Sequence, residues 1–373
     1  MGIFSIFGRK RPATVPTDRV IPLRYWDDLD YLRSLCHAFT FRFDDVLDAF
    51  KLEAALSYRH LPTFFTSLVC HPNSPRELAD WIYTDRPQLH IHAALFQDAT
   101  LLTISYVHTF VDAISRTNFF NAWIAVLRGQ EEDVPAFVPY DHDPLHTLGQ
   151  EAPSQSYSNI GRVLSGFNLV MFGLRYMFEI LWSPKLEEHP IRLPGRCVDQ
   201  MRKTVLEDMA ATAPRGANTE KLFVSEGDVV VAWWVRTMIK ALKPAPDRTI
   251  MVMNVFNVWN LFPEWFPRGT AGLIGNSFFY SYTLLVASKV VQDINLKYVA
   301  FTNRKALMEH RTKQQVEAMT AIQRGNFMRA APVVGDSKML FMAATNQHKA
   351  RYFETDWSAA VISFVTHSEY FVS

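Results

Sequence analysis

Alternating apolar positions mark the first structured part of the chain. Phe39, Phe41 and Phe43 fall on one face of an extended segment, which predicts a strand. The following letters, DDVLDAFKLEAALS, have the apolar spacing of a helix. Residues 75–85 predict a short helix and a turn.

A hairpin followed by a helix is predicted next. In LHIHAAL the histidines alternate with apolar residues, Asp98 supplies a turn, and a β-branched run from Leu101 to Val107 ends at His108. From Asp112 to Leu127 the apolar period becomes helical. The apolar face of this helix is expected to contain Ile114, Phe119, Trp123 and Val126.

The remaining pattern mixes helices and strands. Residues 131–160 are rich in Pro, Asp and Gly and predict a connection, a helical stretch covers 161–182, and a second proline-containing loop follows. LFVSEGDVVVAWWVRTMIKAL is typical of a helix that Ser225 and Asp228 begin with a variant of the capping box. The later runs predict two buried strands (TIMVMNVFNVW and SFFYSYTLLV), one amphipathic helix over 297–323 and two short strand-like segments (KMLFMAATNQH and ARYFETDWSAAVISFV). The fold class is therefore α/β (α+β).

The length of 373 residues exceeds what one hydrophobic core usually contains, so two domains are expected. We divide the chain into a frayed leader (1–19), an N-terminal domain (20–150), a crossover connection (151–195) and a C-terminal domain (196–373).

Charge and cysteine content exclude several classes of protein. Lys plus Arg (38) nearly balances Asp plus Glu (37), so no excess positive charge favours a nucleic-acid partner. Cys36, Cys70 and Cys197 are scattered without metal-ligand spacing and cannot form a disulfide framework. A reducing compartment, the cytoplasm, is the simpler location.

Two segments raise the question of a membrane or targeting role. The start, MGIFSIFGRKRP, has a short apolar stretch that precedes its basic cluster, and Ile6 stands where a myristoylation signal needs Ser or Thr. Residues 164–182 are long enough to span a bilayer, but Arg175 and Glu179 lie within them, four residues apart on one helical face. A frayed leader and a helix packed on the protein or lying on a surface are expected.

The segment His108-Thr109-Phe110-Val111-Asp112 is the main candidate for catalysis. It lies where a strand ends and a helix begins, so its side chains project from a rigid scaffold. An imidazole titrates near neutral pH and can take the proton of an alcohol that attacks a thioester. The spacing alone favours the alternative, a hydrogen-bonded histidine at a strand end.

Other patterns carry less chemistry. His90-x-His92 and Asp141-His142-Asp143 could contribute metal ligands, but a histidine pair on a strand and an acidic turn explain them as well, and no metal is expected. The chain contains no G-x-S-x-G elbow, P-loop or dinucleotide fingerprint.

Several ordered stretches resemble a known family. DRPQLHIHAALFQDATLLTISYVHTFVDAISR, AWIAVLRGQEEDVP, FVSEGDVVVAWWVR, AGLIGNSFFYSYT and ARYFETDWSAA are similar, in this order, to landmarks of the fungal HxxxD (BAHD-type) acyltransferases. These are relatives of trichothecene and hydroxycinnamoyl acyltransferases, and the resemblance covers most of residues 38–365. It implies two similarly folded chloramphenicol-acetyltransferase-like domains, with mixed sheets flanked by helices and an active-site channel between them.

The resemblance also implies roles for four residues. His108 would be the general base, and Asp112 would brace the motif structurally. Asn276 would lie near the donor thioester as a candidate oxyanion contact, and Asp356 would hold a structural loop. A turn residue at Asn276 and a solvated loop acid at Asp356 remain open alternatives.

The chain departs from the family pattern in three respects. Asp356-Trp357-Ser358-Ala359-Ala360 replaces D-F-G-W-G and contains neither glycine. Trp259 stands where the family has an arginine that pairs with the motif aspartate, so the partner of Asp112 is left open. The first domain and the carboxyl terminus are short for the family.

The expected function is transfer of an acyl group from acyl-CoA to a hydroxyl or amine of a small molecule in fungal secondary metabolism. Acyl-CoA would be a co-substrate, no cofactor would be bound permanently, and the enzyme would act as a monomer without a membrane partner. The alternative is a catalytically degenerate relative that binds a ligand or a protein partner.

Overall fold

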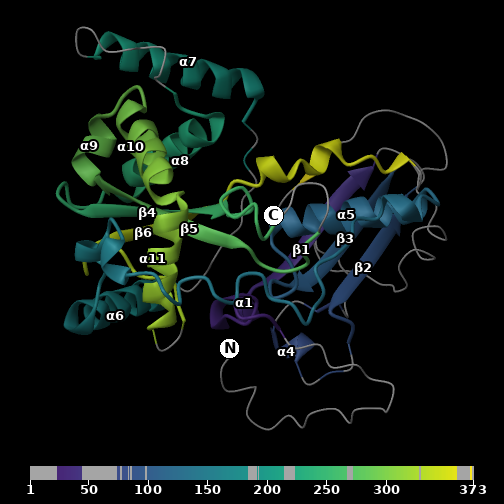
Figure 1. Ribbon diagram of the computed structural model, residues 1–373. Helices are drawn as coiled ribbons and strands as arrows, with labels where there is room; N and C mark the ends of the chain where they lie inside the picture. Colours follow the sequence, from purple (N-terminus) through teal and green to yellow (C-terminus); the bar gives the residue numbers. More distant parts are fainter. Residues whose placement is uncertain are drawn as a thin grey trace. The chain divides into compact units, whose positions relative to one another are not determined.

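The computed structural model describes most of the chain (Figure 1). The described residues are 23–43, 74–75, 78–82, 84, 86–96, 99–183, 191, 193–213, 223–266, 272–326, 329–358 and 370–371. They form two compact units. The first unit contains the described residues up to His146 together with Pro263–Ser277 and those from Gln347 onward, and the second contains Thr147–Phe262 and Phe278–Asn346.

The first unit is built on a four-stranded antiparallel sheet with the order β2-β3-β1-β7. Its strands are β1 (Cys36–Phe43), β2 (Leu89–Leu95), β3 (Thr100–Val107) and β7 (Tyr370–Phe371). The predicted hairpin is confirmed, with Leu89 opposite Tyr106 and Leu95 opposite Thr100. Its turn at Asp98 lies outside the described residues, as does the helix predicted after Phe43.

Helix α5 (Ala113–Leu127) lies along this sheet (Figure 1). The three phenylalanines of β1 point into the core of the unit, as their alternation predicts. They pack with Phe120 and Trp123 of α5 and with Trp357. The predicted helix face was partly wrong: Val126 is 42% exposed, and the buried residues of α5 are Ser115, Arg116, Phe120, Ala122, Trp123, Ile124 and Ala125. The apolar spacing also did not indicate that Arg116, a charged residue, is buried in this helix.

Short helices complete the first unit. They are α1 (Asp30–Ser34), α4 (Leu78–Trp81), η2 (Glu131–Asp133), η6 (His348–Ala350) and η7 (Tyr352–Glu354). α4 confirms the short helix expected over 75–85. The described part of the last strand-like run is irregular around η7, since Arg351 has a positive φ of 51° and interrupts an extended backbone.

The second unit has a three-stranded sheet with the order β5-β4-β6. Strands β4 (Thr249–Asn257) and β5 (Phe278–Val286) are antiparallel, and β6 (Leu340–Ala344) is parallel to β4. One face is covered by α7 (Gly195–Ala211), α8 (Glu226–Leu242), α9 (Ala287–Gln292) and α10 (Lys297–His310). The connections include η3 (Ser154–Ser156) and η4 (Ile160–Arg162).

Side-chain caps mark the starts of two helices in this unit. The capping box of α8 is confirmed: the Ser225 side chain accepts from the Asp228 backbone, and the Asp228 side chain accepts from the Ser225 backbone. The single helix predicted over 297–323 is instead two, because Thr312 caps a new helix, α11 (Lys313–Arg324), by accepting from the backbone N–H of Gln315.

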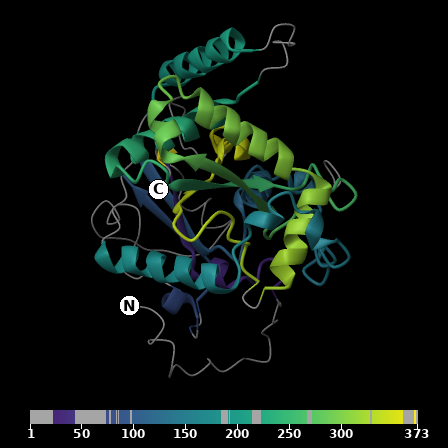
Figure 2. The same cartoon turned by 90° about the vertical axis from the view of Figure 1, so that its left-hand side faces the viewer.

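Helix α6 (Gly166–Trp182) lies on the other side of this sheet from α8 and α10 (Figures 1 and 2). It contains no buried residue, and Phe167 and Trp182 are 77% and 78% exposed. The helix is a surface helix, and no helix in the described ranges is long and apolar enough to cross a membrane.

The division into units differs from the expected boundaries. Residues 263–277 and the described residues from 347 onward group with the first unit, although the sequence division placed them in the C-terminal domain. Asn276 therefore belongs to the same unit as His108, to whose carbonyl it donates a hydrogen bond.

Candidate active site

His108 directly follows β3, as its position after a β-branched run predicts. Its backbone N–H donates to the carbonyl of Leu35 at 2.8 Å, which ties the motif to the segment before β1. The N–H of Phe110 donates to Val107 at 2.9 Å and turns the chain toward α5. The imidazole is therefore carried on a tight connection with fixed ends.

Asp112 is the N-cap of α5. Its Oδ1 accepts from the backbone N–H groups of Ile114 (3.0 Å) and Ser115 (2.8 Å). Its Oδ2 accepts from the backbone N–H (2.9 Å) and the hydroxyl (3.0 Å) of Ser277. The carboxylate is only 4% exposed. Ser277 and the helix start therefore supply the partners that the sequence left open, and these bonds tie α5 to the Gly-Asn segment.

Asn276 is placed beside His108 but does not have a free donor. Its Nδ2 donates to the His108 carbonyl and to Oδ1 of Asp27, both at 2.9 Å. These two bonds use both N–H groups of the amide. The oxyanion contact expected of this side chain is therefore not available in this arrangement. The geometry instead makes Asn276 a support for the His108 loop.

Burial controls the basicity of His108. It lowers the pKa of the imidazole below its usual 6.5, although Asp112 and the Asn276 side chain favour the charged ring. The Arg116 guanidinium acts in the same direction as burial. The lowered pKa favours the neutral imidazole, which is the form that can accept a proton.

A second histidine lies against the first. The rings of His37 and His108 meet edge to face with centroids 4.7 Å apart, and His37 stacks on Tyr106 at 5.8 Å. Burial lowers the pKa of His37 to about 3, and the charges of His108 and Arg116 act in the same direction. His37 therefore stays neutral and restricts the ring of His108 by contact.

Arg116 is the centre of a buried polar cluster with Tyr106, Tyr352 and Gln347. The residue is only 3% exposed, and its guanidinium donates to the two tyrosine hydroxyls and, at 2.6 Å, to Oε1 of Gln347. The guanidinium also lies 4.2 Å from the centroid of the Phe39 ring. Among the residues that the structure describes, aromatic faces and hydroxyls, and no carboxylate in an ion pair, compensate this charge.

Replacing Arg116 with methionine is expected to lower the free energy of unfolding by about 2–4 kcal/mol, because buried hydroxyls lose a charged donor. Lysine should restore little, since one ammonium cannot reproduce the planar fork. Chemical denaturation measures both. Arg128→Met is the control, because Arg128 pairs with the Asp356 carboxylate and donates to its carbonyl at the surface, and its loss should cost less than about 1 kcal/mol. Equal losses at the two positions would contradict the cluster's role.

Asp356 lies in a turn at the surface of the first unit. Its Oδ1 accepts from the backbone N–H of Ser358 at 2.9 Å, and Oδ2 pairs with Arg128. The bond from Ser358 and the Arg128 charge hold the pKa of this carboxyl below its usual value. Trp357, the next residue, is buried in the core. This geometry fits a loop-holding acid, the role that the resemblance implies.

The expected metal-like patterns have other contacts. Asp143 accepts from the backbone N–H groups of Tyr25 and Leu145, both at 3.0 Å, as an acid does in a turn. His90 and His92 lie on β2. Within the described ranges no group of three or more His, Cys, Asp or Glu residues has the arrangement of a metal site.

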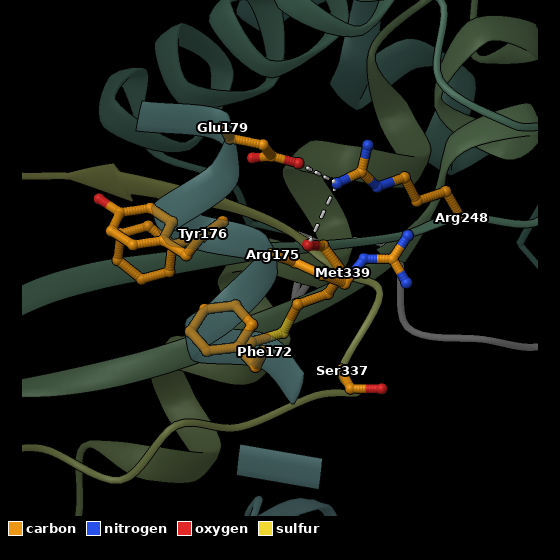
Figure 3. Close-up of a pocket in the computed structure, with 8 residues that line it drawn as sticks. Phe172, Arg175, Tyr176, Glu179, Arg248, Ser337 and Met339 are labelled. Atoms are coloured by element: carbon orange, nitrogen blue, oxygen red, sulfur yellow. Dashed lines mark hydrogen bonds and ion pairs between the residues drawn. The ribbon is translucent and has the colours of Figure 1, made fainter. Parts of the chain in front are cut away.

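A small pocket lies in the second unit, against α6 (Figure 3). It is lined by Phe172, Arg175, Tyr176, Glu179, Arg248, Ser337, Met339 and Phe341. Glu179 pairs with Arg248 at 2.9 Å, not with Arg175 as its i,i+4 spacing suggested. None of the residues predicted for the active site lines this pocket.

Sequence reasoning proposed His108, Asp112 and Asn276 as site residues and did not include the residues that hold them in the structure. The missed residues either lie far from their partners in sequence or look like ordinary surface residues; they are Ser277, Asp27, His37 and Arg116. The only local signal was the Ser277 that follows Gly-Asn in the family-like stretch.

Comparisons with known proteins identify the family of the chain. No protein-family model matches the chain. The chain is 32% identical to acetyltransferase adrJ of Penicillium rubens over 97% of its own length and 86% of that protein. It is 28% identical to calD of Penicillium decumbens, named a transcriptional regulator, over 97% of the chain and 86% of that protein.

The fold comparison points the same way. TRI101 of F. graminearum, solved with ethyl coenzyme A, superposes with a TM-score of 0.59 at 9% identity, over 90% of this chain and 85% of that one. The alignment with adrJ spans 430 residues, more than the 373 of this chain, so the relative carries residues that this chain lacks. The identity to adrJ over nearly the whole chain and the shared fold show that the protein belongs to the BAHD-type (HxxxD) acyltransferase family.

Proposed function

We propose that His108 is the general base in transfer of an acyl group from coenzyme A to a hydroxyl or amine of a small molecule. The observation that carries this proposal is the support of the His108 loop: Asp112 and Asn276 hold its two ends through bonds to α5 and to the Gly-Asn segment. Such support fixes a base for an in-line proton transfer.

The chemistry follows from the neutral imidazole. The acceptor's oxygen or nitrogen attacks the thioester carbonyl while its proton passes to His108, giving a tetrahedral intermediate. Collapse breaks the carbon–sulfur bond, and the proton on His108 passes to the leaving thiolate. Free coenzyme A and the acylated acceptor are the products, and no metal or covalent enzyme intermediate is required. We further propose that coenzyme A is a co-substrate only, and that the protein acts as a cytoplasmic monomer.

The direct test is release of free thiol from acetyl-CoA and longer acyl-CoAs with a panel of alcohols and amines. We expect release that depends on an acceptor and continues unchanged when a chelator is added. The control is the same reaction without an acceptor, which reports thioester hydrolysis. No release above this control with any donor, from folded protein, would contradict the proposal.

A non-catalytic role is the second candidate. Two observations favour it: calD, at 28% identity, is named a regulator, and Ser358, Ala359 and Ala360 replace the last three residues of D-F-G-W-G. A folded protein that binds acyl-CoA, seen by calorimetry, but transfers nothing would support this candidate.

A further inference from the structure

The first described turn of the chain reaches the active-site loop through one buried carboxylate. Asp27 is only 6% exposed, and its Oδ1 accepts two bonds from Asn276: from the backbone N–H at 2.6 Å and from Nδ2 at 2.9 Å. The same Nδ2 donates to the carbonyl of His108. Asn276 thus links Asp27 to His108, the proposed general base, although Asp27 lies far from both residues in sequence.

These bonds fix which way the Asn276 amide points. An amide can exchange its oxygen and nitrogen by a half turn about its last side-chain bond. Two acceptors, Asp27 and the His108 carbonyl, require the nitrogen on their side. The side chain of Asn276 in turn favours the protonated imidazole of His108. Loss of Asp27 removes one of the two acceptors that set this orientation.

Close packing around Gly275 supports the same arrangement. Gly275 has a φ of 156°, and a Cβ on it would lie 3.0 Å from both Nη1 of Arg24 and Oδ2 of Asp27. The carbonyl of Gly275 accepts from the N–H of Asp112 at 3.1 Å. The Gly-Asn segment is therefore enclosed by the Asp27 turn on one side and by the HxxxD loop on the other.

Arg24 anchors the Asp27 turn to the rest of the unit. Arg24 is only 8% exposed, and its guanidinium donates to four backbone carbonyls. These belong to Ile274, Val138, Pro139 and His142. Because Arg24 is held in this way, Asp27 is a rigid support and not a mobile surface acid.

We propose that Asp27 is a positioning residue for acyl transfer: through Asn276 it holds the loop that carries His108. This inference rests on the proposed role of His108 as the base. Asp27 does not touch the reacting atoms. It acts by keeping the imidazole and the start of α5 in place.

The surroundings of Asp27 make this support sensitive to pH. Burial raises its pKa to about 7; the bonds from Asn276 and the Arg24 guanidinium oppose the rise, and the Asp143 carboxylate adds to it. Arg24 and Asp143 are the charged groups that act on it, and the Gly-Asn segment contributes only the neutral Asn276. Protonation below this pKa weakens the bonds to Asn276, because they lose the carboxylate charge.

Three variants test the proposal. Asp27→Ala is expected to lower kcat by about 10- to 100-fold, with little change in KM for the acyl donor, since the base is displaced. Asp27→Asn keeps an oxygen for Asn276 but cannot ionise. At pH 8 wild type should exceed Asp27→Asn, and near pH 6 their rates should converge. The control is Asp28→Ala, because Asp28 pairs with Arg33 at the surface and should leave the rate unchanged.

Hydrogen exchange tests the positioning role of Asp27 without measuring acyl transfer. The backbone N–H of Asn276 should exchange at least about tenfold faster in Asp27→Ala than in wild type or Asp28→Ala, as an amide that loses its buried acceptor does. This exchange rate can be measured even if wild type transfers no acyl group. That outcome would contradict the proposed function but not the positioning role of Asp27. Unchanged exchange and unchanged kcat in folded Asp27→Ala, or an acid limb near pH 7 that persists in Asp27→Asn, would overturn the positioning role.

Discussion

Replacing His108 with alanine is expected to lower kcat for acyl transfer by about 10²- to 10⁴-fold, the usual contribution of a general base. The KM for the acyl donor should change little, because the imidazole contributes to the transition state and not to binding of the donor. Steady-state thiol release measures both constants. The loss should persist at every pH at which wild type is active, since alanine offers no group that can take the proton.

His142→Ala is the matched control for this experiment. His142 is an exposed loop residue of the same unit, and only its backbone carbonyl takes part in the contact with Arg24. Its removal should leave kcat within about twofold, as for a surface substitution. If His108→Ala retains the kcat of wild type, the base is another group and the account of the site is wrong.

Replacing Asp112 with alanine is expected to lower the free energy of unfolding by about 3–5 kcal/mol. Four donors, three from backbone and one from the Ser277 hydroxyl, would lose their acceptor in a buried place. Because these bonds tie α5 to the Gly-Asn segment, kcat should fall as well. Urea denaturation followed by circular dichroism measures the loss.

Two milder changes show which bonds matter. Asp112→Asn keeps an oxygen for the start of α5 but brings an amide toward Ser277, so a smaller loss of about 1–3 kcal/mol is expected. Ser277→Ala removes only the hydroxyl bond and should cost about 1 kcal/mol. If Asp112→Ala is no less stable than Ser277→Ala, the carboxylate does not hold the two segments together.

The sequence predicted the parts of the site that depend on neighbouring residues. The strand that ends before His108 follows from a β-branched run, and the helix that begins after Asp112 follows from apolar spacing. The start of α8 was predicted for the same reason, since Ser225 and Asp228 are three residues apart. Periodicity and capping are local, and a single sequence displays them directly.

The contacts that support the base could not be predicted in this way. Asp112 meets Ser277 across 165 positions, and Asp27 meets Asn276 across 249. Neither pair has a spacing that a local pattern reveals. Arg116 was also missed, because a charged residue on a helix normally faces solvent. The hydroxyls of Tyr106, ten residues away, and of Tyr352, 236 residues away, make its burial tolerable, and only the folded chain brings them together.

The oxyanion role expected of Asn276 shows a limit of carrying roles over from a resemblance. The structure places this residue beside His108, whose carbonyl accepts a hydrogen bond from its Nδ2. Its donors are nevertheless used by Asp27 and by the His108 carbonyl. These hydrogen bonds depend on Asp27, which the resemblance did not include.

The most direct test of the central claim measures free coenzyme A and acylated acceptor together, by thiol assay and mass spectrometry, for wild type and His108→Ala. The account predicts equal amounts of the two products with wild type and neither product above the uncatalysed level with the variant. Acylated product formed by His108→Ala at the wild-type rate, or coenzyme A released by wild type without acylated product, would contradict it.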